Sequence, residues 1–248
     1  ITTSEQKLLY SWNMAGSVNY EDDFADYASS DVASSTIYSY RVEDPVTHVV
    51  TQSQYLQASV NIKSKFTNET LATGTHAIQS FTKYDGSSDQ ELFYTLNMAG
   101  TVNFIANFMD SYQDRDEAGN GVTSTVRYLY NSSGFLNESY TLKDKVIEET
   151  IPDDTVIQSL TKYSGDTDQQ LKYTLNFTKG AAYGQRSTAA VLTTTVYQYS
   201  GQNLNWSVSV TDRQETALTS ANIIQSFTKY DITTSEQKLL YSWNMAGS

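Results

Sequence analysis

The chain of 248 residues contains no cysteine and only two prolines. Without cysteine it can form neither disulfide bridges nor thiolate metal sites, and this composition favours a protein that crosses an envelope and works outside the cell. Basic residues are also few, since 16 Lys and Arg stand against 28 Asp and Glu, a net charge of −12. A chain this acidic is poorly suited to nucleic acid, whose phosphates need Lys and Arg.

Long apolar stretches are missing as well. No segment approaches the roughly 20 apolar residues of a membrane-spanning helix, and no long amphipathic helical stripe is present. No signal peptide is visible and the chain begins in mid-pattern at Ile1, so we expect the natural N-terminus to lie further upstream.

Tyrosine is the abundant aromatic residue, with 19 Tyr against 9 Phe and 3 Trp, and Ser and Thr are frequent. Tyr, Thr and β-branched residues suit a pleated surface that is packed on one side and wet on the other. The composition therefore predicts an all-β fold.

Exact repetition is the strongest signal in the sequence. Residues 1–17 (ITTSEQKLLYSWNMAGS) recur unchanged at 232–248, an offset of 231 residues. Seventeen identities in 17 positions exclude chance. We interpret the chain as one period, plus a short overlap, of a continuous tandem array; an engineered duplication of one end is the alternative.

Inside the 231-residue unit lies a quasi-threefold repeat. Its marker is QSFTKY at Gln79–Tyr84 and Gln225–Tyr230 and QSLTKY at Gln158–Tyr163. Each marker leads through a polar turn into a second matching segment: Leu92–Met98, Leu171–Phe177 and Leu239–Met245. The resulting divisions are 1–78 (its first strand supplied by 225–231 of the preceding unit), 79–157, 158–224 and 225–248, the start of the next unit.

The matching segments alternate with a period of two, which predicts strands. Leu92, Tyr94 and Leu96 fall on one face and should be packed, while Thr95 and Asn97 fall on the other. Gly86 and Gly165 in the polar turns supply positive φ for antiparallel hairpins. With the turn centred near Ser87, Lys83 should face about Glu91.

A second hairpin follows in each copy, marked by Tyr38–Tyr40, Tyr128–Tyr130 and Tyr197–Tyr199. Four strands per copy in three copies predict about twelve strands per unit. The resulting architecture is a β-tube or fibre wall.

Tyr128-x-Tyr130-Asn131-x-x-Gly134-x-Leu136 resembles the YD-type repeat of Rhs and related bacterial surface proteins. Tyr197–Gly201 (YQYSG) is a shorter version of the same pattern. The resemblance implies hairpins that wind into a long β-sheet shell.

Three residue types recur once per copy at fixed places. These are Tyr94, Tyr173 and Tyr241; Lys83, Lys162 and Lys229; and Asn97, Asn176 and Asn244. The tyrosines should be similarly buried in all three copies. For the asparagines we expect a ladder of side-chain amides that hydrogen-bond between neighbouring strands. An isopeptide bond between lysine and asparagine is the less favoured alternative, because the hairpin geometry keeps Lys83 away from Asn97.

Catalytic and metal-binding patterns are sparse. The only histidines, His48 and His76, lie far apart without a repeated carboxylate near them, and no nucleophile elbow is present. Asp114, Asp116 and Glu117 begin like a Ca²⁺ loop, but the twelfth position is Thr125, not Glu, so a solvated acidic loop is the better interpretation. We expect no enzyme activity and no cofactor.

The sequence thus predicts a structural repeat of an extracellular fibre, tube or surface appendage. Its partners would be neighbouring repeats or identical chains, because a repeat cannot cover its own end strands. An adhesin or glycan-binding array, in which exposed Tyr and Trp stack on sugars, and an Rhs-like shell are the alternatives.

Overall fold

The computed structural model describes residues 7–16, 28, 31–43, 47, 49–66, 74–99, 102–104, 121–232 and 238–245. Their regular structure is β-strand, with only short 3-10 turns besides, which confirms the all-β prediction. No helix within these residues is long and apolar enough to cross a membrane. The fold class followed from the two-residue alternation, because that period places one face of each segment in a core.

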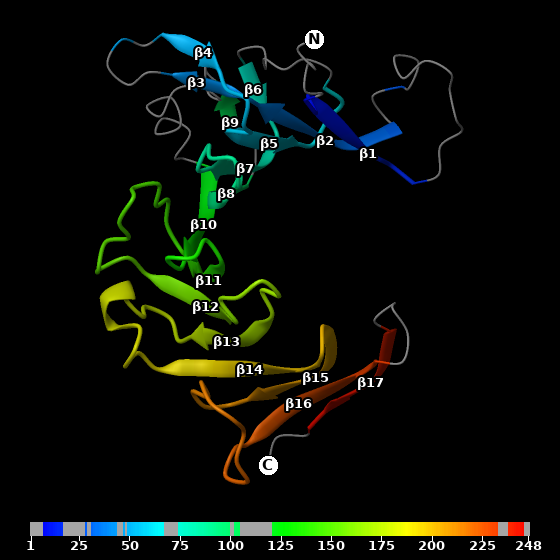
Figure 1. Cartoon of the computed structure of the whole chain (residues 1–248), viewed down its shortest axis with the longest axis vertical. Coiled ribbons are helices and arrows are strands. Elements are labelled where there is room, and N and C mark those ends of the chain that lie inside the picture. The colour runs from blue at the N-terminus through cyan, green and yellow to red at the C-terminus, as the bar shows by residue number, and fades with distance from the viewer. Residues whose placement is uncertain are drawn as a thin grey trace. The chain divides into compact units, whose positions relative to one another are not determined.

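Thirteen strands form one antiparallel sheet in which strands that follow one another along the chain are neighbours (Figure 1). In order they are β1 (Tyr10–Met14), β2 (Val32–Ser39), β5 (Ala58–Ile62), β7 (Ile78–Tyr84), β8 (Leu92–Met98), β10 (Val122–Tyr130), β11 (Leu136–Leu142), β12 (Ile157–Tyr163), β13 (Leu171–Phe177), β14 (Val191–Ser200), β15 (Asn203–Val210), β16 (Ile224–Asp231) and β17 (Lys238–Asn244). Twelve strands therefore precede the point at which the sequence of β1 returns in β17.

Two small sheets accompany the large one. The first pairs β3 (Arg41–Glu43) with β4 (Val50–Gln52), and the second pairs β6 (Gly74–His76) with β9 (Val102–Phe104). The β3–β4 hairpin lies between β2 and β5 in the chain, at the place where the first copy departs from the regular pattern. The return strand of that copy is β5, which pairs directly with β2.

The chain divides into two compact units, residues 1–125 and 126–248. In the first unit the core side chains come from β2, β5, β7 and β8, and Ile37, Val60, Phe81 and Leu96 are fully buried. Tyr94, Leu96 and Met98 of β8 are buried while Thr95 and Asn97 are not. The apolar side of the strand faces the core, as the alternation predicts.

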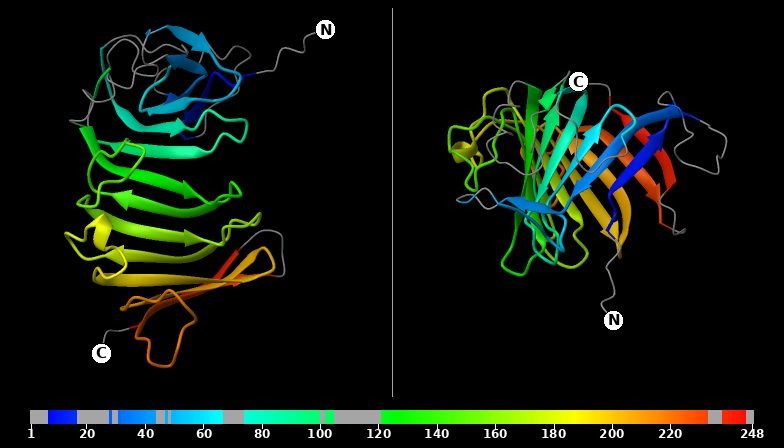
Figure 2. Two further views of the ribbon diagram at one scale, coloured as in Figure 1. Left: turned by 60° about the vertical axis from the view of Figure 1, so that its left-hand side comes forward. Right: turned by 90° about the horizontal axis from the view of Figure 1, so that it is seen from above.

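In the second unit the loops cover one face of the sheet. The strands β11 to β14 lie side by side (green to yellow in Figure 2). Val146 and Ile151, from the loop between β11 and β12, join the cluster of Tyr140, Leu142, Ile157, Leu160, Leu175 and Phe177. A 3-10 turn, η4 (Tyr183–Gln185), places Tyr183 against Tyr140 with ring centroids 5.1 Å apart.

The three marker hairpins β7–β8, β12–β13 and β16–β17 share one register. In each, the lysine lies opposite the tyrosine: Lys83 with Tyr94, Lys162 with Tyr173 and Lys229 with Tyr241. The register shifts directly after the lysine in all three. Equal sequence thus gives equal pairing, including the position of the irregularity.

The predicted partner of Lys83 was wrong. Lys83 lies opposite Tyr94 and not Glu91, because Glu91 belongs to the turn, where its carbonyl accepts a hydrogen bond of 2.9 Å from the amide of Asp85. The bulge after the lysine then moves the pairing by a further residue.

Gly86 has a φ of +78° and Gly165 of +70°, which confirms that these glycines supply the positive φ of the turns. The same turns also place Gln90 and Gln169 at positive φ. The sequence gave no sign of this, because glutamine rarely adopts that conformation.

Candidate functional site: the repeated ladder and its free edge

Hydroxyl pairs connect the two strands of each marker hairpin. Thr82 and Thr95 have their side-chain oxygens 3.1 Å apart, as do Thr161 and Thr174, and Thr228 and Ser242 lie 3.0 Å apart. Directly opposed hydroxyl residues of this kind are a recognised stabilising pair in sheets. Each second strand is therefore tied to the strand before it by one side-chain bond at the same position.

Asparagine side chains connect the same strands to the strand that follows. Asn97 donates from its amide nitrogen to Ser124 at 3.0 Å, and Asn176 donates to Thr193 at 2.9 Å. For these two residues this confirms the expected bonding of Asn amides between neighbouring strands, although the acceptor is a hydroxyl and not a second amide. Asn97 lies opposite Ser80, and Ser80 precedes Lys83 by three residues on β7. The geometry therefore does not favour an isopeptide bond between Lys83 and Asn97.

Two of the repeated lysines, Lys162 and Lys229, bond to side chains of the preceding strand. Lys162 contacts Asn137 and Glu138, each at 2.9 Å from its Nζ, and Tyr140 donates to Glu138 at 2.7 Å. In the third copy Lys229 donates to Asn205, the counterpart of Asn137. Opposite Lys229 the counterpart of Glu138 is Trp206, so the β15–β16 pair has no equivalent of the ion pair that joins β11 and β12.

Burial and charge shift the pKa values of this cluster in opposite senses. Burial raises the pKa of Glu138, but hydrogen bonds from Lys162 and Tyr140 outweigh it, and the net pKa is lowered. Burial and the bond to Glu138 raise the pKa of Tyr140. Burial and nearby carboxylates raise the pKa of Tyr173 to about 12. At neutral pH both phenols are protonated and Glu138 is ionised, so the cluster is a network of hydrogen bonds around one carboxylate and the Lys162 ammonium.

The three repeated tyrosines are not equally buried. Tyr94 is 1 % exposed, Tyr173 is half-buried, and Tyr241 is 42 % exposed. The prediction of similar burial is therefore wrong. The physical reason is their place in the sheet: β8 and β13 have strands on both sides, whereas β17 is the last strand in the sheet order.

β17, the last strand in the order of the described sheet, exposes large apolar side chains. The exposed fractions are 60 % for Leu239, 55 % for Leu240, 56 % for Trp243 and 43 % for Met245. Trp206, Phe227, Tyr241 and Trp243 stack in sequence across β15, β16 and β17, with neighbouring ring centroids 4.9–6.3 Å apart. We refer to these four residues as the aromatic row.

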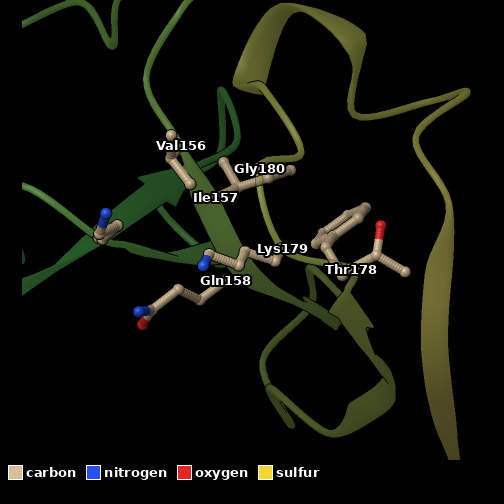
Figure 3. A pocket seen from close by; sticks show the side chains of 8 residues that line it. Val156, Ile157, Gln158, Thr178, Lys179 and Gly180 are labelled. Carbon is tan, nitrogen blue, oxygen red and sulfur yellow. The ribbon is translucent and has the colours of Figure 1, made fainter.

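A shallow pocket of ≈ 450 Å³ lies between β12 and the loop after β13. Figure 3 shows Val156, Ile157 and Gln158 beside Thr178, Lys179 and Gly180. Lys143 and Phe177 complete the lining. The lining combines apolar side chains with two lysines and the hydroxyl of Thr178, and it contains neither a carboxylate nor an imidazole.

Most residues of the weak calcium and histidine patterns lie outside the described residues, namely Asp114, Asp116, Glu117 and His48. His76 lies on β6. Within the described part of the chain, no group of three His, Asp or Glu could hold a metal ion.

Sequence reasoning missed a buried arginine. Arg127 on β10 is fully buried, and its guanidinium donates to the backbone carbonyls of Glu148 and Glu149, at 3.1 Å for Glu149. The contact fixes the loop that carries Val146 and Ile151 over the sheet. In the sequence, Arg127 alternates with Thr123 and Thr125 on one face of a strand, which is only a weak indication that it is buried. Its acceptors are main-chain carbonyls, which leave no mark in the sequence.

No family model matches the chain, and no curated protein matches it. Among solved structures it is similar to a chain in the crystal structure of TcdB2-TccC3-TEV, with 14 % identity and a TM-score of 0.28. The match covers 93 % of this chain and 12 % of that chain. At this TM-score it carries no argument about architecture or function, and those rest on the geometry above.

Proposed function

We propose that the chain is a structural repeat of an extracellular fibre, tube wall or surface appendage, which assembles by adding strands to a continuous β-sheet. One observation carries the proposal: three hairpins use the same residues in the same register, and the strand that ends the sheet has the sequence of the strand that begins it.

A repeated ladder of this kind is suited to a structural role. Every added strand contributes main-chain hydrogen bonds, and every added copy of the repeat contributes one hydroxyl pair in its marker hairpin and one asparagine bond, so stability grows with the number of copies. A repeat architecture also needs its terminal strands covered, because an exposed edge pairs with whatever strand is near. The acidic surface keeps such an assembly solvated.

The aromatic row supports one rival function, the binding of surface glycans. Stacked and exposed Trp and Tyr rings are suitable platforms for sugars. However, Trp12 occupies the position of Trp243 in the identical sequence, and there Lys65 lies 4.8 Å above the indole ring while the indole nitrogen donates to the carbonyl of Phe66 at 2.7 Å. The exposed row therefore corresponds to a packed surface elsewhere in the same chain, which favours the structural role.

A chain with two periods tests the proposal. Residues 1–231 are placed ahead of the present 248 residues, and urea unfolding is compared with that of the single period. Because the m-value scales with the surface exposed on unfolding, a continuous sheet should give one transition with an m-value about twice that of one period.

Electron microscopy of the same two-period chain provides an independent measurement. We expect rods whose length increases with the number of periods. Two globules joined by a flexible segment, with the m-value of a single period, would contradict the continuous sheet. Binding of the single period to sugars on a glycan array, lost in Trp243→Ala, would favour the rival function.

A further inference from the structure

The two copies of the repeated sequence pair on opposite sides. Residues 7–14 and 238–245 are the parts of both copies that the structure describes. The first copy, in β1, pairs with the strand that follows it, β2. The second copy, in β17, pairs with the strand that precedes it, β16. Within the described residues, neither strand has a partner on its other edge.

An internal strand shows what the two half-paired copies look like together. β13 pairs with β12 on one side and β14 on the other, and Thr174 lies between Thr161 and Thr195. Ser242 lies opposite Thr228, and the equivalent Ser11 lies opposite Thr36. Joining the two copies into one strand reproduces the three-strand register around β13.

The agreement extends over the whole strand. Asn176 lies between Ser159 and Thr193, while Asn244 faces Ser226 and Asn13 faces Ser34. The register shift toward the following strand lies between Asn176 and Phe177 in β13 and between Asn13 and Met14 in β1. Both bulges of the internal strand are therefore present, one in each copy.

The side-chain bonds divide between the copies in the same way. β17 makes the hydroxyl pair to its preceding strand, Thr228 with Ser242 at 3.0 Å. β1 makes the asparagine bond to its following strand, Asn13 to Ser34 at 2.9 Å. β13 makes both, at Thr161–Thr174 and Asn176–Thr193.

From this division we infer that β17 of one copy and β1 of the next occupy a single place in the sheet. Residues 238–245 then pair with β16 of their own copy and with β2 of the next. The inference rests on the proposed function, because it names the junction through which the repeats continue. It also differs from edge-to-edge contact between β17 and β1, which would place two identical strands side by side.

For separate 248-residue chains the inference has a specific consequence. The partner of β17 is the β2 edge of a second copy, from which β17 must displace that copy's own β1. The exchange is stabilised by burial of Tyr241 and Trp243 against the segment of the second copy that carries Lys65 and Phe66. Because β1 is tethered to its own β2, exchange depends on protein concentration and on how firmly β1 is bound.

Paired cysteines test this junction, since the chain has no cysteine of its own. One full-length chain carries Ser242→Cys and a second carries Thr36→Cys, and the two are mixed at high concentration in a glutathione redox buffer. Directly opposed residues in an antiparallel pair have Cα atoms about 4.5–5.5 Å apart, within the range for a disulfide. We expect a disulfide-linked heterodimer that disappears on reduction.

The matched control replaces Thr36→Cys with Ser34→Cys, on the same face but two residues away. A diagonal neighbour at about 7–8 Å lies outside disulfide range, so the heterodimer should fall by roughly tenfold. Equal cross-linking of positions 34 and 36 would overturn the inferred register. Cross-linking of Ser242→Cys to Ser11→Cys, without any at position 36, would show edge-to-edge contact and overturn the inference.

A chain carrying both Ser242→Cys and Thr36→Cys distinguishes assembly from closure. We expect a ladder of disulfide-linked oligomers on a non-reducing gel. A monomer with an internal disulfide would mean that β17 takes the place of its own β1, and it would overturn head-to-tail exchange.

The identical tryptophans provide a second measurement that does not need cysteine. Trp12→Lys should weaken the binding of β1 to its own β2 and so increase the fraction of oligomers measured by sedimentation. Trp243→Lys, in the same local sequence, should abolish oligomers because it weakens the binding of β17 to the second copy. The opposite order, or equal effects, would overturn the inference. If the inference fails in this way but the two-period chain still forms a rod, the proposed function holds and the repeats are joined through a different junction.

Discussion

Residues 7–14 and 238–245 have one sequence and two environments. Trp12 is half-buried beneath Lys65 and Phe66, while Trp243 is 56 % exposed. The local conformation is nonetheless similar: Tyr10 and Trp12 have ring centroids 5.6 Å apart at 30°, and Tyr241 and Trp243 have theirs 4.9 Å apart at 25°. The strand conformation is therefore local, while burial depends on which neighbour is present.

The largest contrast is between an interior copy and the edge copy of this strand. Leu175 and Trp243 occupy the same repeat position, but Leu175 is fully buried. Leu175→Ala removes core contacts and should lower the free energy of unfolding by about 2–5 kcal/mol. Trp243→Ala should lower it by less than about 1 kcal/mol in dilute protein, because its side chain is largely in water. Urea denaturation measures both, and equal losses would break the comparison.

The next contrast keeps the sequence constant. Trp12→Ala loses the hydrogen bond to Phe66 and the contact with Lys65 and should destabilise the monomer by about 2 kcal/mol. This is more than Trp243→Ala costs in the same assay. If Trp243→Ala proved the more costly substitution, β17 would be covered in solution by something other than a strand-exchanged copy.

A smaller effect is expected for the asparagine bonds. Asn176→Ala removes the bond to Thr193 and should cost about 0.5–1.5 kcal/mol. Asn244→Ala, at the same repeat position on the exposed strand, should leave the monomer's unfolding midpoint unchanged. Its effect should appear only in oligomers, where the residue gains the partner that Asn13 has in Ser34.

The smallest expected effect is a difference in the pH dependence of stability between the second and third marker hairpins, β12–β13 and β16–β17. Glu138 has a pKa below its ordinary value of 4.5, so its bonds to Lys162 and Tyr140 contribute stability that is present above pH 4.5 and lost as the pH falls through the lowered pKa. Glu138→Gln should remove about 0.5–1 kcal/mol at neutral pH and flatten the acid side of the stability profile. Lys229→Met, where no carboxylate is opposite, should leave that acid limb unchanged.

Much of the fold was accessible from sequence, and the reason is repetition. Alternation in Leu92–Met98 identified a strand and its packed face, and three similar segments identified three hairpins with one register. The partner of Lys83 was not accessible, because a bulge and two glutamines at positive φ decide the length of the turn. The packing of Val146 and Ile151 over the sheet could not be predicted either, because irregular loops have no periodic pattern.

In the candidate site, too, the repeated features could be predicted from the sequence and the unrepeated ones could not. The recurring Lys, Tyr and Asn positions are visible in the sequence because each copy repeats them, and the structure adds their bonding partners. Arg127 was missed because it bonds to main-chain carbonyls, which any sequence can supply. The ion pair of Lys162 and Glu138 left no repeated pattern, because the residue opposite Lys229 is Trp206 and not a carboxylate.

By itself, the sequence determined the all-β class, the alternating faces and the equivalence of residues 1–17 and 232–248, because these depend on local period and on identity. Only the tertiary structure decided which edge of each copy is paired and which tyrosine is buried. Those properties depend on the strand that lies alongside, and Tyr94 and Tyr241 have the same repeat position but a different number of neighbours.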